Sequence, residues 1–237
     1  MIHEHHLAYV LGTNPISTSR TIVRLFTQDA GKRQAVLRRR EKRTQAYLGP
    51  LTLVTCQLRG KEHQELMILE NLELEKHRFE LGARYLGLTL LQHWAHLIDL
   101  SHADGMPDEQ VFRLLGHVLD GCGDGAQTAR LQPANLYLET WLLHFAGVLP
   151  RAIPGGPKHT GSLRHADEAT LHRALNKELL RAIFQQPVEH YLTHALDWGD
   201  FAETQRVLGI LWERFLGRET RTRKSLEQQF EARRLGP

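Results

Sequence analysis

The sequence contains little cysteine and no long apolar run. Cys56 and Cys122 are its two cysteines, and they form no Cys-x-x-Cys pair. This excludes a zinc ribbon and makes a disulfide-stabilised scaffold implausible. No run of 18 apolar residues occurs, and the segment His-Glu-His-His at residues 3–6 is unlike the start of a secretory signal. We therefore expect a cytoplasmic protein.

The sequence also lacks the motifs of several enzyme classes. It has no P-loop, no dinucleotide-binding glycine pattern and no nucleophile elbow. The glycine-rich segment 121–125 follows a predicted helix rather than a strand, which favours a loop. Cys122 has no base next to it in the sequence and is expected to be inert. None of these enzyme classes is therefore indicated.

What is present suits a soluble globular protein with two concentrations of positive charge. Of 237 residues, 41% are apolar and 24% are charged, which allows a substantial hydrophobic core. The net charge is only +3, so the overall balance says little about binding partners. Seven basic residues and one acidic residue nevertheless lie between Lys32 and Arg43, and a second basic run lies between Arg214 and Arg234.

The first third of the sequence has the pattern of short strands. Apolar and β-branched segments are separated by turn residues, and Gly12, Asn14 and Pro15 are expected to end the first strand. Asp29-Ala30-Gly31 predicts a tight turn, because glycine tolerates positive φ. The expected strands are residues 7–11, 21–27, 32–38, 51–58 and 66–74. Five short strands suggest a small β-barrel.

After about residue 78 the apolar residues recur at helical spacing. Asp108 and Asp167 are candidate helix N-caps, and Pro133 is placed as a proline of a first helical turn. Residues 150–162, with three prolines and three glycines, are the clearest loop. The expected helices are residues 79–100, 109–121, 134–146, 167–184, 188–197, 203–216 and 218–230. Strands followed by helices predict an α+β or two-domain arrangement.

Four segments carry a family pattern in a fixed order. Residues 7–38 include YVLGTNPISTSRTIVRLFTQDAGKRQAVLR, and residues 47–60 read YLGPLTLVTCQLRG. Residues 141–150 read WLLHFAGVLP, and residues 211–230 read LWERFLGRETRTRKSLEQQF, a leucine-glycine followed by a basic segment. These segments, which span most of the chain, resemble the RecO family of bacterial recombination mediators.

This resemblance implies an N-terminal OB-fold at residues 1–78 and an all-helical domain at residues 79–237. It implies a DNA repair protein that binds single- and double-stranded DNA, anneals complementary strands and helps to load recombinase onto coated DNA. The implied partners are RecR and the single-stranded-DNA-binding protein, while an indirect part for RecA and RecF stays open. Because such a nucleoid-associated protein makes and breaks no bond, no catalytic residue and no cofactor are expected.

The chain departs from the family pattern at two places. Many members carry four zinc-binding cysteines after the segment that corresponds to Leu149-Pro150, and this chain has none there. We therefore expect no metal. The family often has Gly-Ala-Arg where this chain has Arg38-Arg39-Arg40, so the charge is kept but the local loop geometry is expected to differ.

Within the implied OB-fold, the first basic run predicts a DNA-binding surface. A positive groove follows the phosphate backbone of single strands, while aromatic side chains stack on the bases. Tyr47 is a candidate stacking residue, and Phe26 is expected to be core. The expected DNA-binding residues of this region are Arg20, Arg24, Lys32, Arg33, Arg38, Arg39, Arg40, Lys42 and Arg43.

The second basic run predicts either more DNA surface or a site for an acidic peptide. The expected DNA-binding residues there are Arg221, Arg223 and Lys224. The family binds the acidic, phenylalanine-ended tail of the single-stranded-DNA-binding protein, which needs an apolar pocket with a basic rim. The residues expected to form it are Arg130, Leu138, Trp141 and Leu142, for which ordinary helix core is the alternative interpretation.

Two other functions remain open at this point. A different OB-fold protein could bind RNA rather than DNA. A metal-dependent nuclease could use paired acids such as Glu73 and Glu75, which share one face of a strand. Histidines at positions 3, 5 and 6, or His93 and His96 on a predicted helix surface, could hold a metal, but no carboxylate or cysteine completes either set.

The first basic run generates a direct test. Reversing the charge of Arg39, Arg40 and Arg43 is expected to abolish binding of single-stranded DNA and to leave the fold intact, because the phosphate contacts are lost. A mobility-shift titration measures the affinity, and circular dichroism reports the fold. An unchanged affinity would reject the basic run as a DNA-binding surface.

Overall fold

The computed structural model of the protein describes residues 2–38, 48–61, 64–123, 128–149, 166–193 and 196–234. The chain divides into two compact units, residues 1–113 (unit 1) and residues 114–237 (unit 2), and the division falls within helix α4 (Glu109–Cys122). In these described ranges no helix is both long enough and apolar enough to cross a membrane.

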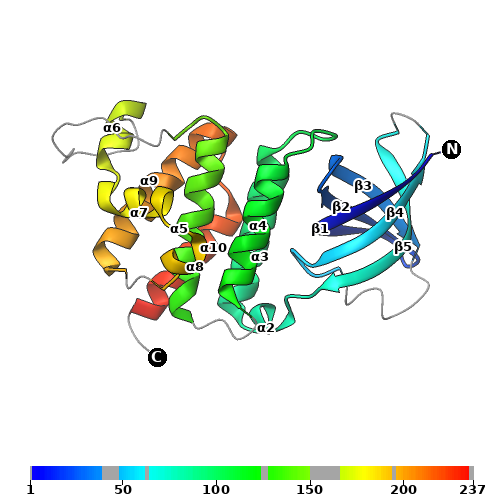
Figure 1. The fold of residues 1–237 in the computed structure, drawn as a ribbon, viewed down its shortest axis with the longest axis horizontal. Coiled ribbons are helices and arrows are strands. Elements are labelled where there is room, and N and C mark those ends of the chain that lie inside the picture. Colours follow the sequence, from blue (N-terminus) through cyan, green and yellow to red (C-terminus); the bar gives the residue numbers. More distant parts are fainter. Residues whose placement is uncertain are drawn as a thin grey trace. The chain divides into compact units, whose positions relative to one another are not determined.

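Unit 1 contains a closed five-stranded barrel (Figure 1). Neighbouring strands are antiparallel except β3 and β5, which are parallel. The strands, which pair in the order β1-β2-β3-β5-β4, are β1 (Ile2–Ser17), β2 (Arg20–Thr27), β3 (Gly31–Arg38), β4 (Leu53–Gly60) and β5 (Leu66–Lys76). This connectivity is that of an OB-fold, so the expected fold class, α+β with an N-terminal OB-fold followed by helices, is confirmed.

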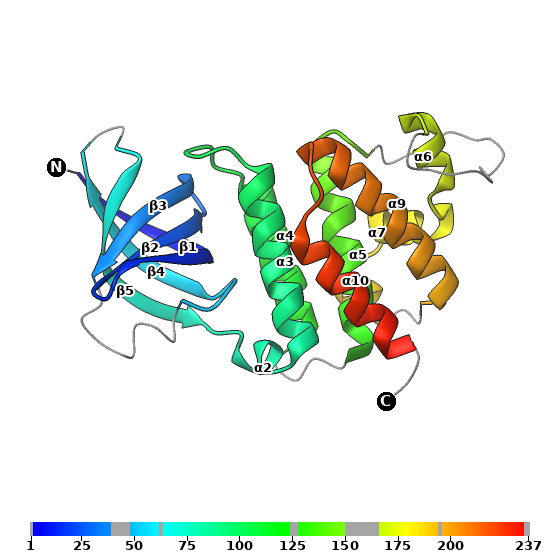
Figure 2. The same cartoon turned by 180° about the vertical axis from the view of Figure 1, so that it is seen from behind.

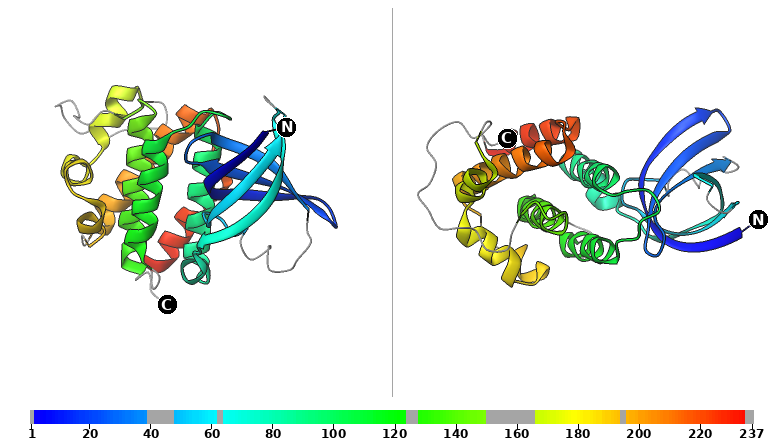
Figure 3. Two further views of the ribbon diagram at one scale, coloured as in Figure 1. Left: turned by 45° about the vertical axis from the view of Figure 1, so that its right-hand side comes forward. Right: turned by 90° about the horizontal axis from the view of Figure 1, so that it is seen from above.

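The barrel core follows from the period of two along each strand. Along β4, buried and half-buried residues alternate without a break, because successive side chains point to opposite faces. Figure 3 shows the strands curving round the barrel axis. The buried side chains at the centre are Ala8, Val10, Val23, Leu25, Ala35, Leu37, Val54, Cys56, Leu58, Met67 and Leu69.

The prediction that β1 ends near residue 11 was wrong. The strand continues to Ser17, and its pairing with β2 shifts register between Val10 and Gly12 and again between Pro15 and Ser17. Such irregularities are β-bulges, in which an extra residue in one strand bends it while pairing with the neighbouring strand continues. Gly12 and Pro15 therefore curve the strand instead of terminating it.

The predicted turn between β2 and β3 is confirmed and depends on Gly31. This glycine has a φ of 68°, and an added Cβ would lie 2.2 Å from the carbonyl oxygen of Met106. Only glycine fits this position, for conformational and steric reasons together. The Thr27 hydroxyl donates to the Gly31 carbonyl over 2.8 Å and closes the turn.

Residues 79–101 form two helices, not the single helix predicted for residues 79–100. Helix α2 (Phe79–Gly82) is followed by α3 (Tyr85–Ser101), and Arg84 between them has an extended backbone. The α2 turn packs closely on α3, since a Cβ added to Gly87 would lie 2.0 Å from the Leu81 carbonyl oxygen. Because Gly87 has no side chain, the end of α2 can pack directly against α3, and the chain bends between the two helices.

Unit 2 contains the remaining helices of the described chain. The predicted proline position was wrong: α5 begins at Thr128, so Pro133 lies inside the helix, where it removes one backbone donor. Asn176 ends the helix predicted for residues 167–184, because its side chain caps a new helix. The helices are α5 (Thr128–Phe145), α6 (Glu168–Ala174), α7 (Lys177–Gln185), α8 (Val188–Tyr191), α9 (Trp198–Leu216) and α10 (Arg221–Arg234).

Both aspartate N-caps predicted from the sequence are confirmed. The Asp108 carboxylate accepts from the Val111 amide over 3.0 Å, and the Asp167 carboxylate accepts from the Thr170 amide over 2.6 Å. Hydrogen bonding by the Thr170 side chain and amide lowers the pKa of Asp167, which keeps the cap ionised. The loop predicted for residues 150–162 lies outside the described residues.

A buried polar network joins α5, α9 and α10, which lie side by side (Figure 2). Asn135 donates to Glu139 over 2.9 Å and to Gln205 over 3.0 Å. The Arg223 guanidinium donates to the other carboxylate oxygen of Glu139, whose side chain is fully buried. At the edge of the network, burial raises the pKa of Glu227. The interior of unit 2 thus contains a buried ion pair in which both oxygens of the Glu139 carboxylate accept hydrogen bonds.

The network predicts unequal effects of two neighbouring substitutions. Arg223→Met leaves the Glu139 carboxylate buried without its cation, which is expected to destabilise the protein by about 3 kcal/mol. Arg221→Met, on the exposed side of the same helix, is the matched control and is expected to cost less than about 0.5 kcal/mol. Urea unfolding followed by tryptophan fluorescence measures both, and equal effects would contradict the structural role of Arg223.

Candidate nucleic-acid interface

The outer face of β2 and β3 carries four of the five expected DNA-binding residues that the structure describes in the barrel. Residues opposite each other in a ladder share a face, and alternate residues follow on the same side. The outward set begins with Arg20 opposite Arg38 and continues with Arg24 opposite Gln34 and Lys32 opposite Phe26. In OB-folds the same two strands and the adjoining loops bind oligonucleotides.

Arg20 and Arg38 form a pair of like charges at the end of this face. They lie directly opposite each other in the register, and both are exposed. Neither has an acidic partner in the described part of the chain. Like charges placed opposite each other destabilise a sheet, so a bound anion between them would remove an existing repulsion. This pair is therefore the candidate phosphate-binding feature of the described part of the barrel.

Arg24 and Lys32 differ from that pair because both contact Asp99 on α3. Arg24 Nη1 lies 2.5 Å from one carboxylate oxygen, and Lys32 Nζ lies 3.7 Å from the other and donates to the Asp99 carbonyl over 2.6 Å. Lys32 also pairs with Asp104 at 3.1 Å. These contacts fix α3 and the following loop to the barrel, so part of the expected DNA-binding charge is neutralised within the fold.

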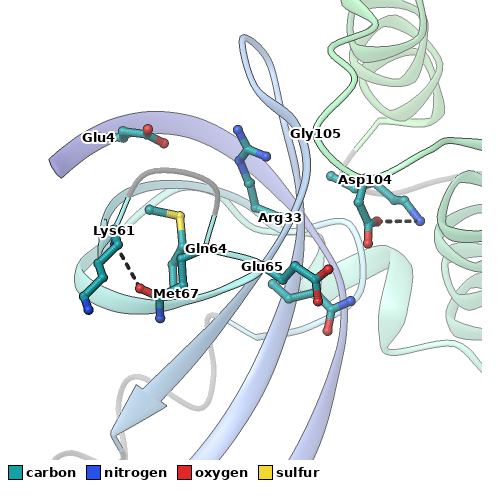
Figure 4. A pocket seen from close by; sticks show the side chains of 10 residues that line it. Glu4, Arg33, Lys61, Gln64, Glu65, Met67, Asp104 and Gly105 are labelled. Atoms are coloured by element: carbon teal, nitrogen blue, oxygen red, sulfur yellow. Dashed lines mark hydrogen bonds and ion pairs between the residues drawn. The ribbon is translucent and has the colours of Figure 1, made fainter. Parts of the chain in front are cut away.

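Arg33 points to a cavity of about 460 Å³ at one end of the barrel (Figure 4). Its position opposite Leu25 gives it the inward parity, unlike its neighbour Lys32. The cavity lies between β3, the connection from β4 to β5 and Gly105, and its walls carry both signs of charge. The lining residues are Glu4, Lys32, Arg33, Gln34, Lys61, Gln64, Glu65, Met67, Asp104 and Gly105.

Arg39, Arg40, Lys42, Arg43 and the candidate stacking residue Tyr47 lie outside the described residues.

Phe26 is fully buried, as expected for a core residue. Its ring lies 6.0 Å from Phe112 and 5.3 Å from the imidazole of His102. Burial lowers the pKa of His102 below its ordinary value, so the imidazole adds no positive charge at neutral pH.

In unit 2 the basic residues of the second run differ in their exposure and in their ion pairs. Arg221 is exposed, and Lys224 is exposed but pairs with Glu219 at 2.6 Å. The prediction of Arg223 as a DNA-binding residue needs correction, because its side chain is buried against Glu139. The period of the helix places Arg223 on its inner side, which a count of basic residues in the sequence does not reveal.

The predicted partner pocket also needs correction. Leu138 and Leu142 are buried and belong to the core, and the Arg130 guanidinium donates to the Gly121 carbonyl over 3.3 Å. Trp141 is half-buried, and α5 and α7 surround it with rings. These are Tyr137, His144, Phe145 and Phe184, the nearest of them 5.1 Å away. The spacing Tyr137, Trp141, Phe145 is the sequence signal that was missed.

The residues considered for metal or acid chemistry are dispersed. His93 was expected on the surface and is fully buried. Glu73 and Glu75 are exposed on β5, and the Glu75 carboxylate accepts a hydrogen bond from Thr55. Among the described residues no three His, Cys, Asp or Glu side chains gather into a possible metal site. Burial raises the pKa of the Cys56 thiol to about 12, so it stays protonated.

Two comparisons bear on this interface. Residues 1–78 match the family model described as "Recombination protein O N terminal". A "DNA repair protein RecO" from Koribacter versatilis (strain Ellin345) is 32% identical to the chain over 146 residues. That match covers 60% of this chain and 58% of the relative, so the chain spans somewhat more than half the length of the relative.

Because of its contacts with Arg24 and Lys32, removing the charge of Asp99 is expected to lower the stability of the protein without weakening DNA binding. The Asp99 side chain is 12% exposed and that of Asp104 is 63% exposed. Asp99→Asn is therefore expected to destabilise the protein by about 2 kcal/mol, since two cations lose a buried partner, whereas Asp104→Asn is expected to cost less than about 1 kcal/mol. Because both changes add positive charge, neither should weaken binding to single-stranded DNA. Thermal unfolding and a binding titration measure these outcomes; a weaker affinity for Asp99→Asn would contradict the assignment.

Proposed function

We propose that this chain, whose two matches support its assignment to the RecO family, acts in DNA repair as a DNA-binding and strand-annealing protein. It binds single- and double-stranded DNA without regard to sequence, brings complementary strands together and helps to load recombinase onto coated single strands. Its residues act by binding and by charge, and none of them makes or breaks a bond.

The observation that carries the proposal is the exposed pair of Arg20 and Arg38 on the outer face of an OB-fold barrel. A phosphate between two guanidinium groups accepts charge-assisted hydrogen bonds, and its binding releases counterions. These contacts go to the backbone, so they carry no sequence information. The N-terminal family match covers the same strands.

Annealing follows from the same charge. Two single strands repel each other through their phosphates, and the repulsion falls when a protein neutralises part of that charge. A surface that binds each strand weakly and without sequence preference lets the strands move along one another until complementary bases meet. Base pairing then supplies the free energy, so the protein needs no catalytic group.

The other predicted residues enter the proposal with unequal weight. Arg39, Arg40, Lys42 and Arg43 follow Arg38 directly in the sequence and would extend the same surface. Arg33 would contribute at the cavity, whereas Arg24 and Lys32 mainly hold α3. In unit 2, Arg221 and Lys224 remain candidates for a second DNA contact, and Arg223 does not.

The proposed protein partners are RecR and the single-stranded-DNA-binding protein. An acidic tail that ends in an aromatic residue needs an apolar site with positive charge nearby. In unit 2 the half-buried Trp141, with the exposed Phe145 and with Phe184, offers rings of the required kind. This cluster replaces Leu138 and Leu142 as the proposed docking site for that tail.

The test removes the arginine pair and measures how DNA binding depends on salt. Arg20→Gln with Arg38→Gln is expected to weaken binding of a single-stranded oligonucleotide at least tenfold at low salt. Since each phosphate contact on a single strand contributes about 0.7 to the slope of log affinity against log salt, the slope should fall by about 1.4. Annealing of two labelled complementary strands should slow in parallel.

Arg113→Gln is the matched control, because Arg113 is an exposed arginine of the same unit and is paired with Glu109. It should leave the affinity, slope and annealing rate unchanged. Equal affinity of the Arg20/Arg38 variant and the unmodified protein would reject this face as the interface. Tighter binding of RNA than of DNA in competition would favour an RNA-binding function instead.

A further inference from the structure

Two large aromatic side chains of unit 1 are left in solvent near the end of the barrel. Phe79, at the start of α2, is 48% exposed, and Tyr85, at the start of α3, is 65% exposed. His77, just before α2, stacks on Phe79 with the ring centres 4.7 Å apart and the ring planes 13° from parallel. The three rings lie within nine residues of the sequence.

The other aromatic residues that the structure describes in unit 1 are part of the core. Tyr9, Phe26, Trp94 and Phe112 are all buried. The outer face of β2 and β3 therefore presents basic, polar and aliphatic side chains in its described residues, but no exposed ring, because Phe26 is covered. OB-fold proteins that bind single strands without sequence preference combine a positive surface with exposed rings on which bases stack. Phe79 and Tyr85 are the described residues of unit 1 that meet the second requirement.

The local fold holds these rings in solvent instead of burying them. α2 follows β5 directly in the chain, and the Ala83 amide at its end donates to the Phe79 carbonyl over 2.7 Å. The close packing of Leu81 on Gly87 then fixes the turn of α2 against the start of α3. Leu81 fills the apolar position of this corner, so Phe79 and Tyr85 are not needed for the core.

We propose that His77, Phe79 and Tyr85 form a platform on which unpaired bases of single-stranded DNA stack. The proposal rests on the DNA binding proposed above and names a second kind of contact for it. The His77 imidazole already stacks on one face of the Phe79 ring, so the two rings form the first layers of a stack. A base would extend that stack, or would lie on the exposed ring of Tyr85.

The charge around the platform favours contact with bases over contact with phosphates. In the sequence of this segment, Glu75 and Glu80 offset two of the three basic residues Lys76, Arg78 and Arg84, and Arg78 is buried. Stacking does not depend on net charge, whereas phosphate contacts do. The platform also distinguishes strands, because the bases of a duplex are already stacked on their neighbours. It therefore gives preference for single strands, and the arginine pair binds either form.

The experiment compares a thymine oligonucleotide with an oligonucleotide of the same length made of abasic sites. Phe79→Leu with Tyr85→Leu is expected to weaken binding of the thymine oligonucleotide between about 5- and 150-fold for each base that loses its ring. Binding of the abasic oligonucleotide and of duplex DNA should stay unchanged, as should the slope against salt. The full chain is used throughout.

Two control variants separate stacking from general effects. Phe79→Tyr with Tyr85→Phe keeps both rings and is expected to bind like the unmodified protein. Met106→Ala removes another highly exposed apolar side chain of unit 1 that has no ring, and it should bind normally. Thermal unfolding of each variant confirms that the fold is intact.

The outcomes distinguish failure of the platform from failure of the proposed function. If the leucine variant binds the thymine oligonucleotide as tightly as the unmodified protein does, while the Arg20/Arg38 variant binds weakly, the platform is wrong and the DNA-binding function stands. An equal loss on the thymine and abasic oligonucleotides would also overturn stacking. If the unmodified protein binds neither oligonucleotide nor duplex, both proposals fail.

Discussion

Closure of the barrel is the constraint on which the arrangement of unit 1 depends. The parallel pairing of β3 with β5 and the antiparallel pairing of β4 with β1 leave no free sheet edge. Side chains fill the centre of this closed barrel of five strands. Alternate residues are therefore forced outward, and the arginines of β2 and β3 that have the outward parity come together on one face.

The acidic residues of α3 and its following loop then divide that positive charge. Asp99 neutralises Arg24 and Lys32 and in doing so attaches α3 to the barrel. Arg20 and Arg38, farther along the same face, keep their charge for solvent or for a ligand. The charge that stabilises the fold and the charge proposed to bind DNA thus lie on one face of the barrel. The two groups of cations differ in whether a carboxylate of α3 or of its following loop contacts them.

Unit 2 uses charge in a different way. Arg223 and Glu139 are buried together, and Asn135 and Gln205 satisfy the remaining hydrogen-bonding groups of the carboxylate. A buried ion pair of this kind costs desolvation and is weak evidence for high stability. It nevertheless requires α5, α9 and α10 to meet in one register, because any other register would leave a charge unpaired. The helices of this unit are specified by polar contacts as well as by apolar packing.

The sequence alone determined the class of fold, the strand-to-helix order, the tight turn at Gly31 and the caps at Asp108 and Asp167. These features depend on residues close together in the chain, such as alternating apolar positions, a glycine with positive φ or a side chain beside its own helix terminus. The breaks between helices were missed, because close packing of Leu81 on Gly87 and an internal cap at Asn176 overrode a continuous apolar period.

The tertiary structure decided which basic residues of the described chain are available. Arg24 meets Asp99 across 75 positions of sequence, and Arg223 meets Glu139 across 84. No local pattern encodes such pairs, since opposite charges attract in space and not along the chain. The sequence therefore determined that positive charge would gather on a barrel, and folding determined which of those charges are neutralised and which face solvent.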